Sequence, residues 1–147
     1  MIRATQVIPA ADVNSTDDTI ELDFDHRHRR RFAMTSHSGR EFLLDLPRAA
    51  ALQHGDGLLL EDGRVIVVQA KPEPVADITA TDTQHMNRIA WHLGNRHLPT
   101  EIHSDFLRIR EDHVIVDMVR QLGGEVELKL APFHPEGGAY SGHSHAH

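Results

Sequence analysis

The chain has 147 residues, enough for one domain or for two small ones. Fifteen Lys and Arg residues against 22 Asp and Glu residues give a net charge of −7, which argues against a general role in binding nucleic acid. The absence of cysteine argues against a Cu(I) carrier, an iron-sulfur protein or a Cys-based zinc site. No apolar run approaches the ~20 residues of a membrane span, and the N-terminus lacks a signal-peptide pattern, so we expect a cytoplasmic protein without membrane association.

The first half of the chain has the pattern of short β-strands. Apolar and polar residues alternate over residues 20–24, 32–34 and 42–46, and residues 64–68 are rich in β-branched side chains. Asp62-Gly63 predicts a hairpin turn between two apolar runs, because glycine tolerates the positive φ of such turns. Several short strands must close or pack on one another to bury their apolar faces. We therefore expect an all-β domain over residues 1–71, a small and partly open barrel.

The second half has a different pattern, which begins after Pro72 and Pro74. Two prolines so close together predict neither a helix nor a β-ladder, and they indicate a domain boundary. Strands are predicted over residues 75–80, 100–103, 106–110 and 125–131, with helices capped by Thr81 or Asp82 and by Asp112. This β-α-β-β-α-β order predicts a ferredoxin-like α+β domain over residues 72–136, with both helices on one face of the sheet. Residues 137–147 cannot build a core, so we expect a mobile His-rich tail.

The tail carries the clearest chemical signal of the chain. His143, His145 and His147 alternate in a protein with thirteen histidines and no cysteine, and imidazole is a ligand for Ni, Zn, Cu(II) and Fe. The tail therefore predicts metal binding, although a His-rich composition does not say whether the metal is catalytic, stored or in transit. An expression tag is the alternative interpretation, but tags usually carry consecutive histidines.

His97 is the histidine that the chain constrains most. Gly94 ends the preceding helix and Pro99 favours extended backbone before it, so His97 must lie in a short loop at a helix C-terminus. One imidazole cannot hold a transition metal. Two chains that met about a two-fold axis near this loop would each contribute His97, and the tail could then complete the coordination. His113 and His103 are the next candidates, with a structural or surface role favoured for each. His85 and His92 are expected on the exposed face of the first helix.

Several motifs together resemble one known family. The residues that carry the resemblance are 94–99 (GNRHLP), 112–114 (DHV), 132–140 (PFHPEGGAY), the His-rich end and the alternating basic run at 25–31. In this combination the chain resembles the urease accessory protein E family, the nickel metallochaperones of urease maturation. The resemblance spans nearly the whole chain.

The resemblance implies a first domain that contacts protein partners and a homodimer, joined through the second domain, with Ni(II) at the interface and no catalytic activity. It assigns the interfacial ligand to His97 and makes the tail histidines auxiliary ligands. A His-X-His arrangement of some members matches His113 at its second position, but Glu111 occupies the first. Zn(II) and Cu(II) remain alternatives in vitro, because imidazole binds both. The implied partners are the urease apoprotein and the urease accessory proteins, including the GTPase.

The basic run has two interpretations. As a strand, Arg27, Arg29 and Arg31 would place charge at an exposed edge, which protects a sheet against unwanted pairing. Alternatively, these arginines form a docking stripe for an acidic partner in the urease maturation complex.

Two other functions also compete with the nickel chaperone. A metal-dependent enzyme would need three fixed ligands and a general base, and no HExxH-like motif is present. The second competing function is a protein-interaction module with an incidental His tail.

Overall fold

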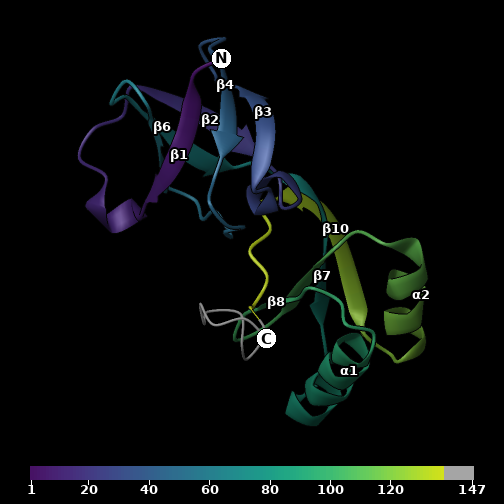
Figure 1. The fold of residues 1–147 in the computed structure, drawn as a ribbon. Coiled ribbons are helices and arrows are strands. Elements are labelled where there is room, and N and C mark those ends of the chain that lie inside the picture. Colours follow the sequence, from purple (N-terminus) through teal and green to yellow (C-terminus); the bar gives the residue numbers. More distant parts are fainter. Residues whose placement is uncertain (138–147) are drawn as a thin grey trace. The chain divides into compact units, whose positions relative to one another are not determined.

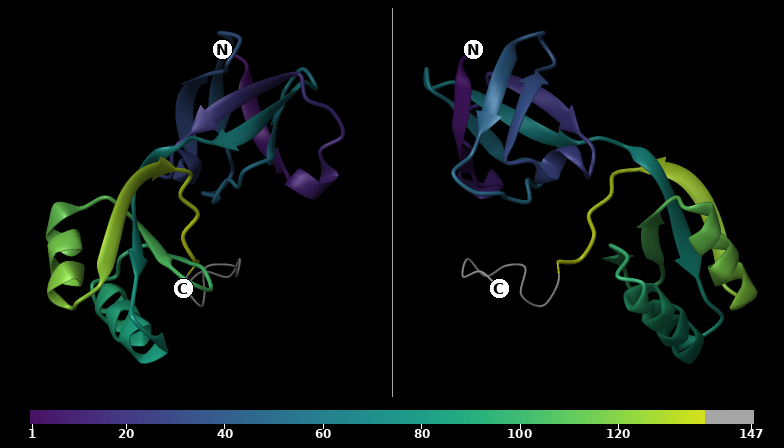
Figure 2. Two further views of the ribbon diagram at one scale, coloured as in Figure 1. Left: turned by 180° about the vertical axis from the view of Figure 1, so that it is seen from behind. Right: turned by 45° about the vertical axis from the view of Figure 1, so that its right-hand side comes forward.

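The computed structural model describes residues 1–137 and divides the chain between Lys71 and Pro72 into two compact units. Both units are drawn as ribbons in Figures 1 and 2. The predicted mobile tail lies outside the described residues from position 138 onward. In the described part, neither helix is long and apolar enough to cross a membrane.

The first unit is a six-stranded sheet that curls into a nearly closed barrel (Figure 2). Its strands are β1 (Arg3–Ile8), β2 (Asp18–Leu22), β3 (Arg31–Thr35), β4 (Glu41–Asp45), β5 (Gly57–Leu60) and β6 (Val65–Ala70), in the order β2-β6-β5-β1-β4-β3. Two pairs, β1 with β4 and β2 with β6, are parallel, and the other pairs are antiparallel. The prediction of a small, partly open barrel is confirmed.

Alternating residues of these strands fill the interior of the barrel. The residues that are at most 6% exposed include Ile20, Leu22, Phe42, Leu44, Leu58, Leu60, Ile66 and Val68. Burial of each such side chain contributes about 1.5–3 kcal/mol. The predicted hairpin turn between β5 and β6 is also confirmed, with Gly63 at φ 89°. Sequence analysis missed β1, because its pairing with β5 shifts register between Ala4 and Gln6 and its burial does not alternate.

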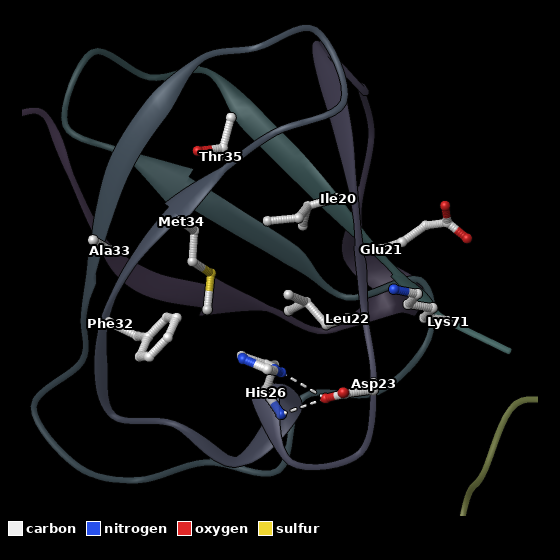
Figure 3. Close-up of a pocket in the computed structure, with 10 residues that line it drawn as sticks. All are labelled: Ile20, Glu21, Leu22, Asp23, His26, Phe32, Ala33, Met34, Thr35 and Lys71. Carbon is white, nitrogen blue, oxygen red and sulfur yellow. Dashed lines mark hydrogen bonds and ion pairs between the residues drawn. The ribbon is translucent and has the colours of Figure 1, made fainter. Parts of the chain in front are cut away.

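The two edge strands, β2 and β3, border the opening of the barrel. At one end the Asp18 carboxylate accepts hydrogen bonds from the hydroxyls of Ser36 and Ser38, and His37 N–H donates to the Thr19 carbonyl at 2.8 Å. At the other end a hollow separates the edges, as Figure 3 shows. Its apolar lining comes from Ile20 and Leu22 of β2 and from Phe32, Ala33 and Met34 of β3. Hydrogen bonds therefore join the two edge strands at the Asp18 end.

The basic run does not form the alternating strand that the sequence predicts. Residues His26–His28 form a short 3-10 helix, η2, and β3 begins only at Arg31. Asp23 causes the turn: its carboxylate accepts the backbone N–H of His26 at 2.9 Å, and its carbonyl accepts that of Arg27 at 3.0 Å. Arg27 is thereby turned inward and is only 2% exposed, so the prediction of an exposed stripe is wrong at this residue. Arg29 and Arg31 are exposed.

The second unit has the predicted ferredoxin-like order. Its elements are β7 (Glu73–Thr79), α1 (Thr83–Asn95), β8 (Glu101–Ile102), β9 (Leu107–Arg110), α2 (His113–Gln121) and β10 (Glu125–Ala131). The antiparallel sheet has the strand order β10-β7-β9-β8. Both predicted N-caps are confirmed, since Asp82 accepts the N–H of His85 and Asp112 accepts those of Val114 and Ile115.

Both helices pack on the same face of this sheet (Figure 1). Ile89 and Leu93 of α1 and Ile115 and Val119 of α2 join one core with Ala76, Ile78, Leu107 and Ile109 of the sheet. His85, expected at the exposed surface, links the two helices. Its Nδ1 accepts the N–H of Thr81 at 3.1 Å, which leaves Nε2 to donate to the Leu122 carbonyl at 2.8 Å.

Pro74 lies inside β7, so the prediction that the two prolines exclude a ladder is wrong here. β7 begins at Glu73, and Pro74 is in register with Leu130 of β10. The Pro74 carbonyl accepts the N–H of Glu111, so its nitrogen also faces the β9 side. Because the β7–β9 ladder begins only at Val75, the missing N–H of Pro74 removes no ladder bond.

Candidate metal site

His97 lies immediately after α1, in a well-defined helix-end motif. Its N–H donates to the Gly94 carbonyl at 3.0 Å, and the N–H of Leu98 donates to the Leu93 carbonyl at 3.3 Å. Leu98 also packs against the core that contains Leu93. These two hydrogen bonds and the apolar contact define a Schellman motif. His97 occupies the position that usually requires a left-handed backbone, and its φ is 57°.

This backbone conformation is unusual for histidine. Among residues 1–137, His97 is the only non-glycine residue with a positive φ. Glycine or asparagine would adopt this conformation at lower cost, and a Cβ in the left-handed region costs on the order of 1 kcal/mol. The side chain is exposed, so it does not recover this energy by packing. An exposed imidazole held here at an energetic cost makes His97 a candidate functional residue.

Residues 132–136, which we name the strap, return from β10 to the start of β8. Arg108 Nη1 donates to the Pro132 carbonyl at 3.3 Å, and the N–H of His134 donates to Glu101 Oε1 at 2.8 Å. The N–H of Glu136 donates to the Thr100 carbonyl at 2.8 Å. The last described residues are therefore fastened next to the segment that carries His97.

The reach of the chain follows from this attachment. Thr100 is three residues after His97, so their Cα atoms are within ~11 Å of each other. His143 is seven residues after Glu136, and an extended chain of that length spans ~24 Å. His143, His145 and His147 lie outside the described residues, but the length of the chain allows them to reach His97.

His113 and His103 are in different situations. His113 is the first residue of α2 and is exposed. A hollow is lined by residues that include Leu98 and Pro99, which follow His97 in the chain, and Glu111 and Asp112, which precede His113. In contrast, His103 Nε2 is 2.5 Å from Glu101 Oε2, and its ring stacks on Phe106 with a centroid distance of 4.1 Å. These contacts agree with the structural role expected for His103.

Within residues 1–137, no group of three or more His, Asp or Glu side chains could hold a metal ion. A metal site that includes His97 would therefore require further ligands from the tail or from another chain. The helix that precedes His97 carries an exposed apolar residue: Trp91 of α1 is 64% exposed. Trp91 is two residues after the buried Ile89, which places it ~200° around the helix, away from the core. Such an exposed Trp is typical of an interaction surface.

Charged residues cover the sheet face opposite the helices. Arg108 donates to both carboxylate oxygens of Asp77, at 2.7 and 3.0 Å, and Lys129 Nζ lies 3.3 Å from Asp77 Oδ2. Burial by itself raises the pKa of Asp77, but the hydrogen bonds from Arg108 and Lys129 outweigh it and hold that pKa below its ordinary value. The hydrogen bonds to Asp77 raise the pKa of Arg108 in turn. The pair is therefore ionised and holds β7 to β9.

The described residues thus combine a small β-barrel with a ferredoxin-like domain that presents one strained, exposed histidine. Residues 4–71 match the family described as UreE urease accessory protein, N-terminal domain, and residues 73–147 match UreE urease accessory protein, C-terminal domain. The chain belongs to the UreE family of urease accessory proteins. The family name describes an accessory protein and not an enzyme, which confirms that prediction.

Individual relatives agree with this assignment. Urease accessory protein UreE of Chelativorans sp. (strain BNC1) is 57% identical over 145 residues, which cover 99% of this chain and 90% of that protein. The protein of the same name from Bradyrhizobium sp. (strain ORS 278) is 57% identical over 148 residues, covering 100% of this chain and 70% of the relative. The one from Rhodobacter capsulatus is 45% identical over 150 residues, covering 99% and 94%.

Proposed function

We propose that this chain is a homodimeric nickel chaperone of the cytoplasm that binds Ni(II) at the dimer interface and delivers it to the urease assembly complex. The observation that carries the proposal is the position of His97. An exposed imidazole occupies a left-handed helix-end position, and the strap brings the start of the His-rich tail next to the same segment. Membership of the UreE family supports the role in urease maturation.

The two-fold arrangement rests on coordination chemistry. A single imidazole cannot hold Ni(II), and the described residues supply no complete site. In a symmetric dimer one surface meets its own copy, so His97 faces the partner's His97. The exposed Trp91, on the helix that precedes His97, is suited to the apolar part of that interface. We propose His113, the first residue of α2, as a secondary ligand.

Delivery requires ligands that leave one at a time. In the proposed site the tail histidines, His143, His145 and His147, dissociate first and are replaced by ligands of the receiving protein. Protons compete with the metal because imidazole must be neutral to bind it, so we expect affinity to fall in acid solution. Zn(II) and Cu(II) compete in vitro. The receiving partners are the urease apoprotein and the other urease accessory proteins, including the GTPase, with Arg29 and Arg31 on the docking surface.

Isothermal titration of the full chain with Ni(II) tests this function, with the oligomeric state measured by light scattering. We expect one tight site per dimer and no turnover of hydrolytic substrates. His97→Ala should remove the tight site and leave the dimer intact. Unchanged affinity in His97→Ala would overturn the assignment, and one tight metal per monomer would contradict the two-fold site. A complete lack of binding would favour the protein-interaction module, and turnover with bound metal would favour the enzyme.

A further inference from the structure

The strand β10 forms one edge of the sheet in the second unit. Within residues 1–137 it pairs only with β7, over all seven residues from Glu125 to Ala131. The other side of its backbone therefore has no strand partner in this part of the chain. An unpaired edge of this length accepts another strand unless its side chains prevent the pairing.

Pro74 shows which residues of β10 offer hydrogen bonds on the open side. The Pro74 carbonyl accepts the N–H of Glu111, so it is turned away from β10, although Pro74 is in register with Leu130. Two opposite residues of an antiparallel pair either exchange both hydrogen bonds or turn both sets of polar groups outward. Leu130 therefore turns its N–H and C=O to the open side. Since this direction alternates along a strand, Leu128 and Val126 do the same.

The side chains of these residues leave an apolar surface beside the edge. Val126 packs against the core under the helices, and Leu128 and Leu130 follow it on the same face of the strand. Leu128 is 51% exposed and Leu130 is 70% exposed. The neighbouring helix α2, which contacts β10, adds Val114, which is 54% exposed (Figure 1). A partner that covers this surface would be stabilised by the burial of apolar side chains.

Two charged side chains alternate with the apolar ones, on the other face of the sheet. Glu127 and Lys129 are 67% and 40% exposed, and within one chain Lys129 Nζ lies 3.0 Å from Glu127 Oε1 and 3.3 Å from Asp77 Oδ2. A charge on an edge strand usually prevents pairing, because it faces an incoming strand without a partner. Here the two charges have opposite signs and are two residues apart. A second copy of β10 can therefore place each of them opposite the other.

These charges select one register for two antiparallel copies of β10. With the two-fold axis at Leu128, Glu127 faces the partner's Lys129. In the same register Val126 faces the partner's Leu130, and all of these apolar residues turn their hydrogen-bonding groups toward the partner. An axis shifted by one residue would place Glu127 opposite the partner's Glu127, or Lys129 opposite the partner's Lys129. Like charges directly opposite each other are destabilising, so the register centred on Leu128 is favoured.

We propose that β10 is a self-association surface, at which a second copy of this chain adds its own β10 and joins two four-stranded sheets across a two-fold axis. His97 lies close before β8, which is at the opposite edge of the sheet, and three spacings between neighbouring strands separate β8 from β10 by ~14 Å. This interface is therefore separate from the one proposed at His97, and it requires no metal. Two different two-fold interfaces on one chain allow dimers to assemble into a tetramer.

Hydrogen exchange in the full chain without metal tests the proposal at individual amides. The amides of Leu128 and Leu130 face the open side, so their exchange should slow as the protein concentration rises and the edge becomes paired. The amides of Glu127 and Lys129 face β7 and should be protected at every concentration, which makes them internal controls. Sedimentation of the same samples measures the accompanying change in mass.

Two charge variants test the register. Glu127→Lys places lysine opposite lysine, and Lys129→Glu places glutamate opposite glutamate, so each variant alone should associate through β10 about 10-fold more weakly. An equimolar mixture restores both contacts between opposite charges and should recover the association. Glu125→Lys is the matched control, because it makes the same change of charge but faces the partner's Ala131. Circular dichroism verifies folding, and Leu128→Lys, which places two lysines at the axis, replaces Lys129→Glu if that variant does not fold.

We expect protection of the Leu128 and Leu130 amides to rise with concentration in the native chain and in Glu125→Lys, to be lost in Glu127→Lys, and to return in the mixture. If both amides stay unprotected at the highest concentration, the proposal is overturned and the edge is left to a strand of a different protein. A mixture that associates no better than its separate components would also overturn it. His97→Ala should leave the protection unchanged, whereas its loss in that variant would mean that association depends on the His97 interface and not on β10.

Discussion

Asp77 and Arg108 lie opposite each other on neighbouring strands and are joined by two hydrogen bonds of 2.7 and 3.0 Å. Both side chains are largely buried, at 9% and 14% exposure. Asp77→Ala would leave the Arg108 guanidinium without its main partner, and we expect the free energy of unfolding to fall by about 2 kcal/mol. Urea denaturation followed by the fluorescence of Trp91, the only tryptophan of the chain, measures this effect in the second unit.

The double variant Asp77→Ala with Arg108→Ala separates the pair from its surroundings. Since it leaves no uncompensated guanidinium, it should be more stable than the sum of the two single changes predicts. Strict additivity would mean that the two residues do not interact in solution.

Asp18 makes the first unit sensitive to acid. The hydroxyls of Ser36 and Ser38 donate to its carboxylate and lower the pKa of Asp18 to about 2. A group whose pKa is lowered by folding stabilises the protein above its ordinary pKa of 3.8, and this contribution is lost as the pH falls from 3.8 towards 2. We expect the stability of the first unit to decline in this window, as measured by circular dichroism. Asp18→Asn should flatten the decline, and Trp91 fluorescence serves as an internal control from the second unit. An identical pH profile in the variant would show that this carboxylate does not fasten the seam.

His97→Gly should make the protein more stable and at the same time remove its tight binding of Ni(II). Glycine adopts the left-handed backbone after α1 without strain, so we expect the free energy of unfolding to rise by about 1 kcal/mol. The same change removes the imidazole and should abolish tight Ni(II) binding. His97→Ala, which keeps a Cβ, should lose the metal without this gain. Urea denaturation and titration with Ni(II) measure the two effects, and equal stabilities of the two variants would mean that His97 is not strained.

Reversal of charge at Arg29 and Arg31 tests docking. Both residues are exposed, so glutamate at each position should leave folding and nickel affinity unchanged. If they steer an acidic partner, association with the urease complex should weaken, and the difference from the native chain should shrink as salt shortens the Debye length below ~8 Å. Urease activation in cells and binding at two salt concentrations measure this. Normal activation would favour the edge-protecting role. Arg27 is not a suitable target because it is buried.

Local signals predicted the second unit well. Asp82 and Asp112 are preferred capping residues, and apolar positions at helical spacing follow each of them, so both helices could be placed from sequence. The position of Pro74 inside β7 could not be predicted from sequence. Proline is tolerated there because the ladder between β7 and β9 does not include it, and the sequence does not show where that ladder begins. Similarly, η2 depends on the Asp23 carboxylate, which lies three residues before His26 and accepts its backbone N–H. In sequence, the same residues look like a regular strand.

The sequence singled out His97 as a candidate ligand but did not predict its backbone geometry. The sequence indicated a constrained loop at His97, yet the helix continues past Gly94, and the left-handed position falls on His97 itself. Glu101 was missed, although its alternation with Ile102 resembles that of a strand with one charged face. What sequence could not reveal is that β8 and the strap, more than thirty residues apart, meet at this carboxylate.

The parallel pairing of β2 with β6 sets an order of folding during translation. β2 is complete after Leu22, but within residues 1–137 its only ladder is with β6, and the N–H of Val65 donates to the Asp17 carboxylate 48 residues away. The hairpins β3–β4 and β5–β6 are local and can form as soon as they leave the ribosome. The side chains of Ile20 and Leu22 therefore cannot be buried in the barrel until β6, the last strand of the unit, has been synthesised. A nascent chain therefore presents an unpaired apolar edge during this interval, and slow synthesis between residues 22 and 70 would prolong its exposure to aggregation.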